Sequence, residues 1–179
     1  MSVSYMGTRM RLMGWTAALA ALLMTSVPAT AAPVGAPVKP KARGLLLTPL
    51  TLTRIQDLEF GSLIPSGTPG TVVINATSGV RTTFGGVTAL ASGAGQRARF
   101  AGAGTPGQQV FVLVVPPTVL TNPNGDTLDV LALPLDGSPI RTIAPDRTFF
   151  VGVGGIISVA ANQPDGLYTA EFEVFADYQ

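Results

Sequence analysis

The sequence contains no cysteine and no histidine, and only 12% of its 179 residues are charged. Without cysteine the chain has no disulfide bond and no thiol nucleophile, and without histidine it has no imidazole, the side chain used most often as a general base. The two absences together also remove the usual zinc ligands. With 46% hydrophobic residues, the composition is not that of a disordered chain. We therefore expect a folded protein that is not an enzyme and holds no cofactor.

The first 31 residues have the pattern of a secretory signal peptide. Arg9 and Arg11 precede a short apolar run over residues 12–24, and Ala29 and Ala31 provide a small-x-small cleavage site. The run is too short to span a membrane, and later apolar runs are interrupted, so no transmembrane segment is expected in the mature chain. The pattern predicts export, first to the periplasm and then to the cell surface or beyond.

Removal of the signal peptide leaves 9 basic and 10 acidic residues. The basic residues are scattered, and the closest cluster is Lys39, Lys41 and Arg43, which lies in a proline-rich stretch over residues 32–43. That stretch is expected to be a flexible arm. No basic patch is large enough to indicate nucleic-acid binding.

Residues 44–179 are expected to form a single domain. Their many glycines and prolines divide the chain into short apolar segments, which is typical of an all-β protein, and no segment shows a helical period. The pattern predicts an immunoglobulin-like Greek-key β-sandwich. The most apolar segment, residues 109–115, is expected to be a central strand buried on both faces. Residues 80–84 and 87–90 are expected to pair with each other around Gly85 and Gly86.

The last fourteen residues, 166–179, alternate between apolar and polar side chains. This period of two predicts a half-buried antiparallel strand that begins after Gly166 and ends the fold. The candidate interaction residues on this strand are Gly166, Tyr168, Phe172, Val174 and Tyr178.

A leucine-rich segment over residues 44–53 follows the arm and carries Leu45, Leu47, Leu50 and Leu52. Pro49 confines it to a sheet edge or a bulge. One interpretation is the first strand of its own domain. The other is a donor segment that adds as a strand to a neighbouring subunit. The sequence leaves both open.

Three motifs suggest chemistry but have simpler explanations. The glycines of residues 152–155 are followed by a strand, whereas a phosphate-binding loop requires a helix. Residues 122–126 do not have the spacing of a calcium-binding loop and predict a tight turn. Glu171 and Glu173 lie on one strand face and are expected to be solvated.

Three motifs, in this order and spacing, resemble a bacterial secreted family known as "domain of unknown function 4402": Asp57-Leu-Glu-Phe-Gly61, Val151-Gly-Val-Gly-Gly155 and Gln163-x-x-Gly166-x-Tyr168-x-x-x-Phe172 closing on Tyr178. That family resembles the pilins of chaperone–usher fimbriae and spore-coat-U-type subunits. The resemblance implies a sandwich that lacks its last strand. It also implies that a periplasmic chaperone fills the gap and that the N-terminal extension of the next subunit then replaces it, with an outer-membrane usher as a further partner.

Two functional hypotheses follow. The first is a structural, non-enzymatic exported subunit of a pilus-like surface fibre or coat, assembled with copies of itself or related subunits by β-strand complementation. The second is a self-complete secreted binding module whose loops recognise a carbohydrate or a surface protein.

Overall fold

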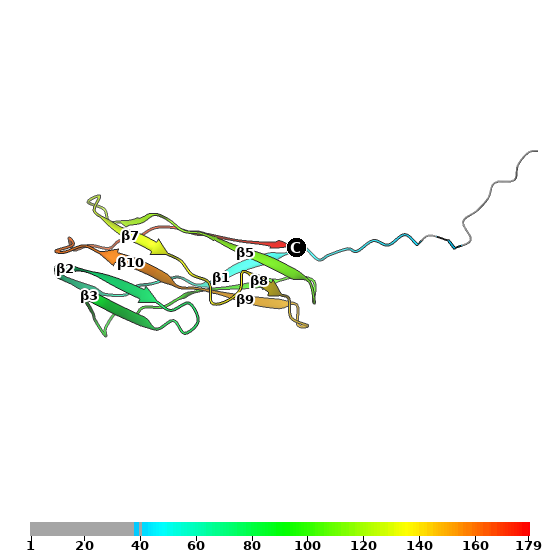
Figure 1. Cartoon of the computed structure of the whole chain (residues 1–179), viewed down its shortest axis with the longest axis horizontal. Helices are drawn as coiled ribbons and strands as arrows, with labels where there is room; N and C mark the ends of the chain where they lie inside the picture. The colour runs from blue at the N-terminus through cyan, green and yellow to red at the C-terminus, as the bar shows by residue number, and fades with distance from the viewer. Residues whose placement is uncertain (1–37, 40) are drawn as a thin grey trace, which may run out of the picture. The chain divides into compact units, whose positions relative to one another are not determined.

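The computed structural model describes residues 38, 39 and 41–179. The predicted signal peptide and most of the predicted arm lie outside these residues. Residues Gly44–Gln179 form one compact unit (Figure 1). The regular secondary structure in the described part of the chain is all β, as predicted. No helix there is long and apolar enough to cross a membrane.

The strands follow the segments that alternate or are continuously apolar in the sequence. They are β1 (Thr51–Gln56), β2 (Leu63–Ile74), β3 (Arg81–Ala89), β4 (Ala98–Ala103), β5 (Gln109–Val115), β6 (Val119–Thr121), β7 (Thr127–Ala132), β8 (Ile140–Thr142), β9 (Thr148–Val153), β10 (Gly155–Val159) and β11 (Glu173–Tyr178).

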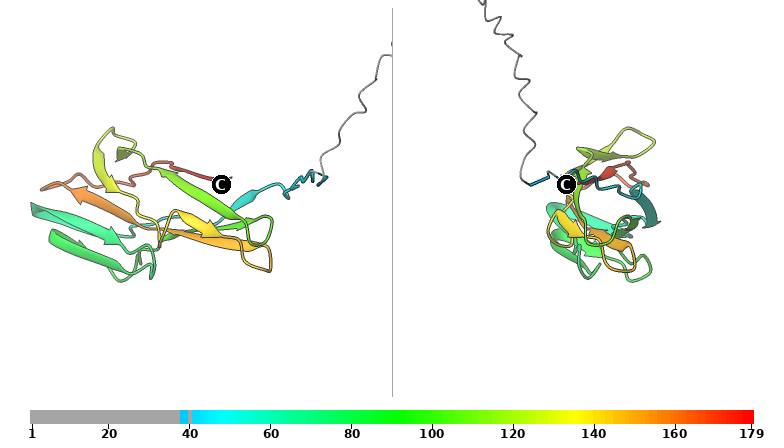
Figure 2. Two further views of the ribbon diagram at one scale, coloured as in Figure 1. Left: turned by 45° about the vertical axis from the view of Figure 1, so that its right-hand side comes forward. Right: turned by 90° about the vertical axis from the view of Figure 1, so that its right-hand side faces the viewer.

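The strands form three antiparallel sheets in a sandwich-like arrangement. Their orders are β1-β4-β9, β3-β2-β10-β7-β6 and β11-β5-β8. Within the unit, β2, β3, β7 and β10 gather at one end, and β1, β5, β8 and β9 gather at the other (Figure 1). The view along the long axis of the unit shows the strands around a shared interior (Figure 2). The chain passes from one sheet to another at Gly154, between β9 and β10.

Two clusters of buried apolar side chains fill this interior. The first contains Ala98, Val110, Val112, Ile143, Phe149, Val151 and Val153. The second contains Val72, Val87, Leu128, Ile157 and Val159. Each fully buried valine or isoleucine contributes about 1.5–3 kcal/mol of transfer free energy, so these clusters are the main source of stability.

The prediction that β5 is buried on both faces is wrong. Val110 and Val112 are buried, but Phe111, Leu113 and Val115 on the other face are 39%, 47% and 44% exposed. No strand of the described chain covers that face of the β11-β5-β8 sheet. The strand whose residues are buried or half-buried throughout is β10, because it lies between β2 and β7 in the centre of the five-stranded sheet.

The predicted hairpin around Gly85 and Gly86 is also wrong. Residues 81–89 form one strand, β3, which pairs with β2. Gly85 has a positive φ of 70°, and a Cβ at this position would lie 2.6 Å from the Pro69 carbonyl oxygen. The two glycines therefore form an irregularity within a strand, where the register shifts between Pro65 and Gly70, and not the turn between two strands.

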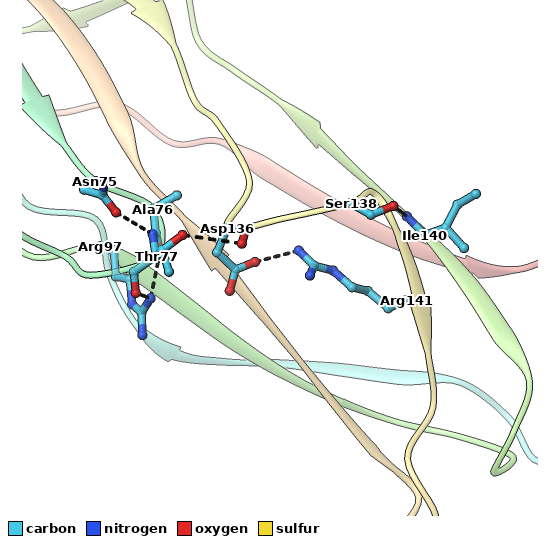
Figure 3. A network of polar contacts seen from close by, with 8 residues as sticks. All are labelled: Asn75, Ala76, Thr77, Arg97, Asp136, Ser138, Ile140 and Arg141. Atoms are coloured by element: carbon cyan, nitrogen blue, oxygen red, sulfur yellow. Dashed lines mark hydrogen bonds and ion pairs between the residues drawn. The ribbon is translucent and has the colours of Figure 1, made fainter.

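A network of polar contacts joins the turn after β2 to the loop before β8 (Figure 3). The Arg97 guanidinium donates to the Ala76 carbonyl at 2.8 Å and also to that of Thr77. Arg141 of β8 donates from its guanidinium to the carboxylate of Asp136, in the loop before that strand, at 2.6 Å. The side chains of this pair are only 19% and 22% exposed, so solvent screens their attraction weakly.

Replacing Asp136 with asparagine is therefore expected to lower the free energy of unfolding by about 2 kcal/mol, because it leaves the Arg141 charge half-buried without its counter-ion. The measurement is urea denaturation at pH 7. Asp57→Asn is the matched control, since Asp57 pairs with Arg54 in an ion pair whose side chains are 58% and 66% exposed. That change should cost less than about 1 kcal/mol. Equal losses in the two variants would contradict the prediction.

The exposed Asp146 carboxylate caps the turn before β9. It accepts hydrogen bonds from the Thr148 hydroxyl at 2.8 Å and from the Thr148 amide at 3.0 Å. These bonds favour the charged form and lower the pKa of Asp146 below its ordinary value of 3.8, the hydroxyl bond having the larger effect.

Thr148→Val removes the hydroxyl and should raise the pKa of Asp146 toward that ordinary value. A carboxyl-carbon NMR titration measures this shift. Because the folded pKa is the lower one, the stability that Asp146 contributes is present above pH 3.8 and is lost as the pH falls through the folded pKa. Wild type and variant therefore differ in free energy of unfolding partly because of Asp146. This part of the difference should disappear in acid. A pKa that stays unchanged in the variant would contradict this account.

Candidate functional site

Two strands at the ends of the domain sequence are edge strands of their sheets. Among the strands of residues 41–179, β1 pairs with β4 alone and β11 pairs with β5 alone. The terminal strand β11 lies near β1 at the end of the unit where the carboxyl terminus is marked in Figure 1. Unpaired edges of this kind present rows of free backbone N–H and C=O groups that can accept a further strand.

The side chains that point inward from these two strands are incompletely covered. Four on the closing segment pack against the first core cluster and are only partly buried: Phe172, Val174, Ala176 and Tyr178. Leu50 and Leu52, at the start of the domain, are in the same condition. In contrast, Val110 and Val112 on the neighbouring β5 are at most 1% exposed. The core is thus sealed beneath β5 and remains accessible between β1 and β11.

A cavity of about 230 Å³ opens in this gap. Ala98, Phe100 and Phe172 line it from the core side, and the rings of the two phenylalanines meet edge to face with centroids 6.2 Å apart. Arg54, Gln56 and Asp57 line it from β1 and the residues after it, and Ala170 and Glu171 from the closing segment. We use the term "groove" for the space between β1 and residues 170–178, with this cavity at one end.

Tyr178 closes the other end of the groove. Its hydroxyl accepts a hydrogen bond from the Thr105 amide at 2.8 Å and donates one to the Thr48 carbonyl at 2.7 Å. Thr48 is also held by a bond from its amide to the Thr105 hydroxyl at 2.7 Å. The closing strand therefore ends beside the point where the leucine-rich segment enters the domain.

The structure divides the predicted donor segment, residues 44–53, into two parts. Thr51, Leu52 and Thr53 pair with β4 of the same chain, so the part after Pro49 is an internal strand. Leu45 and Leu47 precede that strand and are 72% and 37% exposed, and Leu46 between them is 94% exposed. In the described chain, the leucines before Pro49 are therefore not part of a strand paired within the domain. A donor role is open to that part of the segment alone.

The predicted residues at the start of the closing segment have structural surroundings. Gly166 has a φ of 150° and lies against the Asn122 side chain. Tyr168 packs against the second core cluster, and its hydroxyl donates to the Pro164 carbonyl at 2.8 Å. Both lie outside the groove, which begins at residue 170.

The turn predicted over residues 122–126 is confirmed. The Asn122 side-chain oxygen accepts hydrogen bonds from the amides of Asn124 and Asp126 at 3.0 and 2.8 Å, and its Nδ2 donates to the Asp126 carboxylate at 2.8 Å. Glu171 and Glu173 are exposed, as expected. Within residues 38, 39 and 41–179, no group of three or more acidic side chains is placed to hold a metal ion.

Sequence reasoning did not identify Phe100 or Arg54 as groove residues. Phe100 alternates with Arg97 and Arg99 in the sequence, which indicates an inward side chain but does not show which neighbouring side chain it contacts. Residues 54–57 and 98–100 meet residues 170–172 only through the fold, and nothing local in the sequence shows this contact.

The sequence profile of the family described as "Domain of unknown function (DUF4402)" matches residues 50–178. The chain belongs to this family. The DUF4402 match includes β1 through β11 and ends with Tyr178, so both walls of the groove lie within the family's domain. The exposed residues Leu45, Leu46 and Leu47 precede it. Comparison with curated proteins and with solved structures found no match to this DUF4402 chain in either set.

Proposed function

We propose that this DUF4402 protein is a structural, non-enzymatic exported subunit of a pilus-like surface fibre or coat, assembled by β-strand complementation. In this proposal the domain is an immunoglobulin-like Greek-key sandwich that lacks one strand, and the missing strand belongs between β1 and β11. The exposed stretch before Pro49 on another copy of the chain, or on a related subunit, supplies it. A periplasmic chaperone covers the groove during export, and an outer-membrane usher receives the subunit.

The observation that carries this proposal is the incomplete cover over the inward side chains of the two facing edge strands. A self-complete sandwich buries such rows beneath a paired strand, as Val110 and Val112 are buried in β5. Here Val174, Ala176 and Tyr178 remain partly exposed along a free edge. An added strand would satisfy the backbone groups of that edge and cover the apolar row in one step.

The test removes the donor stretch and keeps the domain. Deletion of residues 38–47 from the mature chain should abolish SDS-resistant oligomers on unboiled gels, a loss of at least about 100-fold, because the added strand supplies both hydrogen bonds and apolar contacts. Deletion of residues 32–37 is the control and should leave the oligomers intact. Circular dichroism checks that both proteins are folded. Oligomers that persist without residues 38–47 would refute the proposal.

The alternative function, a secreted binding module for a carbohydrate or a surface protein, is favoured by one observation. The outer face of the β11-β5-β8 sheet exposes Phe111, Leu113, Val115, Ile140 and Phe175. Exposed apolar patches often mark binding surfaces. A binding module of this kind would be monomeric both with and without residues 38–47, so the same deletion experiment separates the two functions.

A further inference from the structure

The segment that leads into the first strand is open to other molecules. All residues from 41 to 49 are exposed, and none of them belongs to a strand. In the described chain, the first hydrogen bond that ties this segment to the domain runs from the Thr48 amide to the Thr105 hydroxyl. A Cβ added at Gly44 would have no described atom within 4 Å, its chain neighbours aside. The backbone on both sides of Gly44 is therefore accessible.

Three basic residues precede Gly44 at every second position, namely Lys39, Lys41 and Arg43. All three are exposed. Proteases of the trypsin type have a carboxylate in their specificity pocket and cut after lysine or arginine. The chain around such a site has to be exposed and free of bonds to the folded domain, because it must lie in the cleft of the protease. Residues 41–47 meet both requirements.

Most arginines of the domain do not meet these requirements. Four of them lie within strands: Arg54, Arg81, Arg99 and Arg141. Arg97 directly precedes β4, and its guanidinium donates to the Ala76 carbonyl at 2.8 Å. A strand has to leave its sheet before a protease can bind it, so cleavage at these positions requires unfolding.

Arg147 is exposed and lies in a turn, but its backbone is held in place. Its amide donates to the Ala144 carbonyl at 2.9 Å, and its carbonyl accepts a bond from the Gly104 amide at 3.0 Å. Its φ of 71° is in the left-handed region. An extended backbone, as in a peptide bound along a strand, needs a negative φ, so this turn is a poor protease substrate.

Within the exposed segment, the bond between Arg43 and Gly44 is the favoured one. A guanidinium forms two parallel bonds to a carboxylate, whereas an ammonium group acts as a point charge. A cut after Lys41 would leave Arg43 available for a second cut, and the next basic residue, Arg54, lies in β1. The end product therefore begins with Gly44, the first residue of the compact unit.

We propose that a trypsin-like protease processes this protein at the bond between Arg43 and Gly44. Water adds across the amide, so that Arg43 ends in a carboxylate and Gly44 gains an ammonium group. The step removes three basic residues and no acidic residue, and residues 44–179 keep 6 basic and 10 acidic residues. The three leucines of residues 45–47 stay on the domain. This processing step does not depend on the proposed function.

Limited digestion of residues 32–179 with trypsin, followed by intact-mass spectrometry, tests the accessibility of the site. We expect one stable product, residues 44–179, with cleavage inside the domain at least about 1,000-fold slower because it needs unfolding. Arg43→Gln should shift the cut to Lys41, so that the product begins with Ala42. Arg147→Gln is the matched control and should change neither rate nor product. Cleavage after Arg147 as fast as after Arg43 would contradict the proposal.

Sequencing the amino terminus of protein taken from the producing cells tests whether the step occurs there. The wild-type protein should begin with Gly44. The double variant Lys41→Gln and Arg43→Gln should keep residues 42–44 joined, and thermal denaturation checks that its domain is folded. A wild-type protein that retains Arg43, or a double variant that still begins with Gly44, would overturn the assignment. Neither result bears on the proposed function, which is tested by deletion of residues 38–47.

Discussion

Replacing Gly154 with alanine is expected to destabilise the domain by about 4 kcal/mol or more, which is a large part of the roughly 5–15 kcal/mol by which an ordinary protein is stable. Gly154 is buried at the point where the chain leaves β9 and enters β10. A Cβ at this position would lie 2.3 Å from the Ile74 carbonyl oxygen and 2.6 Å from the Ala76 amide nitrogen. Both contacts are with backbone, so no side-chain rotation relieves them.

The backbone around Gly154 cannot move without breaking the junction between sheets. Its amide donates at 2.9 Å to the Pro134 carbonyl, and the next residue, Gly155, pairs with Ile74 of β2. Moving β2 away to admit a methyl group would disturb the fully buried Ile74. The clash should therefore appear as a loss of cooperative folding and not as a local adjustment.

Chemical denaturation of Gly154→Ala and of a matched glycine variant measures this effect. Gly67 also lies in a strand, but its nearest atom to an added Cβ would be the Asn162 side-chain oxygen at 4.0 Å. Gly67→Ala should change the free energy of unfolding by less than about 0.5 kcal/mol. A Gly154→Ala protein as stable as Gly67→Ala would show that the junction is not packed as described.

The closing strand could be predicted from the sequence because its information is local. Residues 172–178 alternate regularly, and the inward row that this pattern predicts is the row that packs on the core. The segment between Gly166 and β11 is less regular, with a single bridge between Thr121 and Thr169. The sequence therefore predicts the type of element well and its beginning less well.

The two wrong strand predictions have a common cause. An apolar run such as β5 has the same pattern whether its second face is covered or exposed, and the cover is provided by distant parts of the chain. Similarly, a glycine pair is compatible with a turn or with an irregularity inside a strand. In β3 the choice depends on the approach of Pro69 and Gly70, which no pattern within residues 80–90 reveals.

The groove could be predicted only in part for the same reason. The wall that contains Val174 and Tyr178 could be predicted, because apolar and polar residues alternate there and because the segment ends the domain. The opposite wall depends on how β1 pairs with β4, and the cavity depends on where Phe100 meets Phe172. The division of residues 44–53 at Pro49 also follows from pairing: Thr51 reaches β4, and the leucines before Pro49 do not.

The second large effect is expected from replacing Leu45, Leu46 and Leu47 together with aspartate. These side chains are 72%, 94% and 37% exposed in the isolated subunit, so their replacement should leave its thermal unfolding temperature almost unchanged. In the assembled state, burial of leucine contributes about 1.5–3 kcal/mol, before ordering costs, for each side chain on the strand face that covers the groove. Oligomer yield should fall by at least about 1,000-fold.

Leu167→Asp provides the control for this prediction, because Leu167 is 76% exposed but lies before the groove-lining residues. It should assemble normally. The comparison separates two roles for the exposed leucines. If they are only surface residues of a monomeric binding module, the triple variant and Leu167→Asp behave alike, and neither changes the size of the particle in solution. If they complete the neighbouring domain, the triple variant is a stable monomer that no longer assembles. Deletion of residues 38–47 should then also give a stable monomer, because it removes the same leucines.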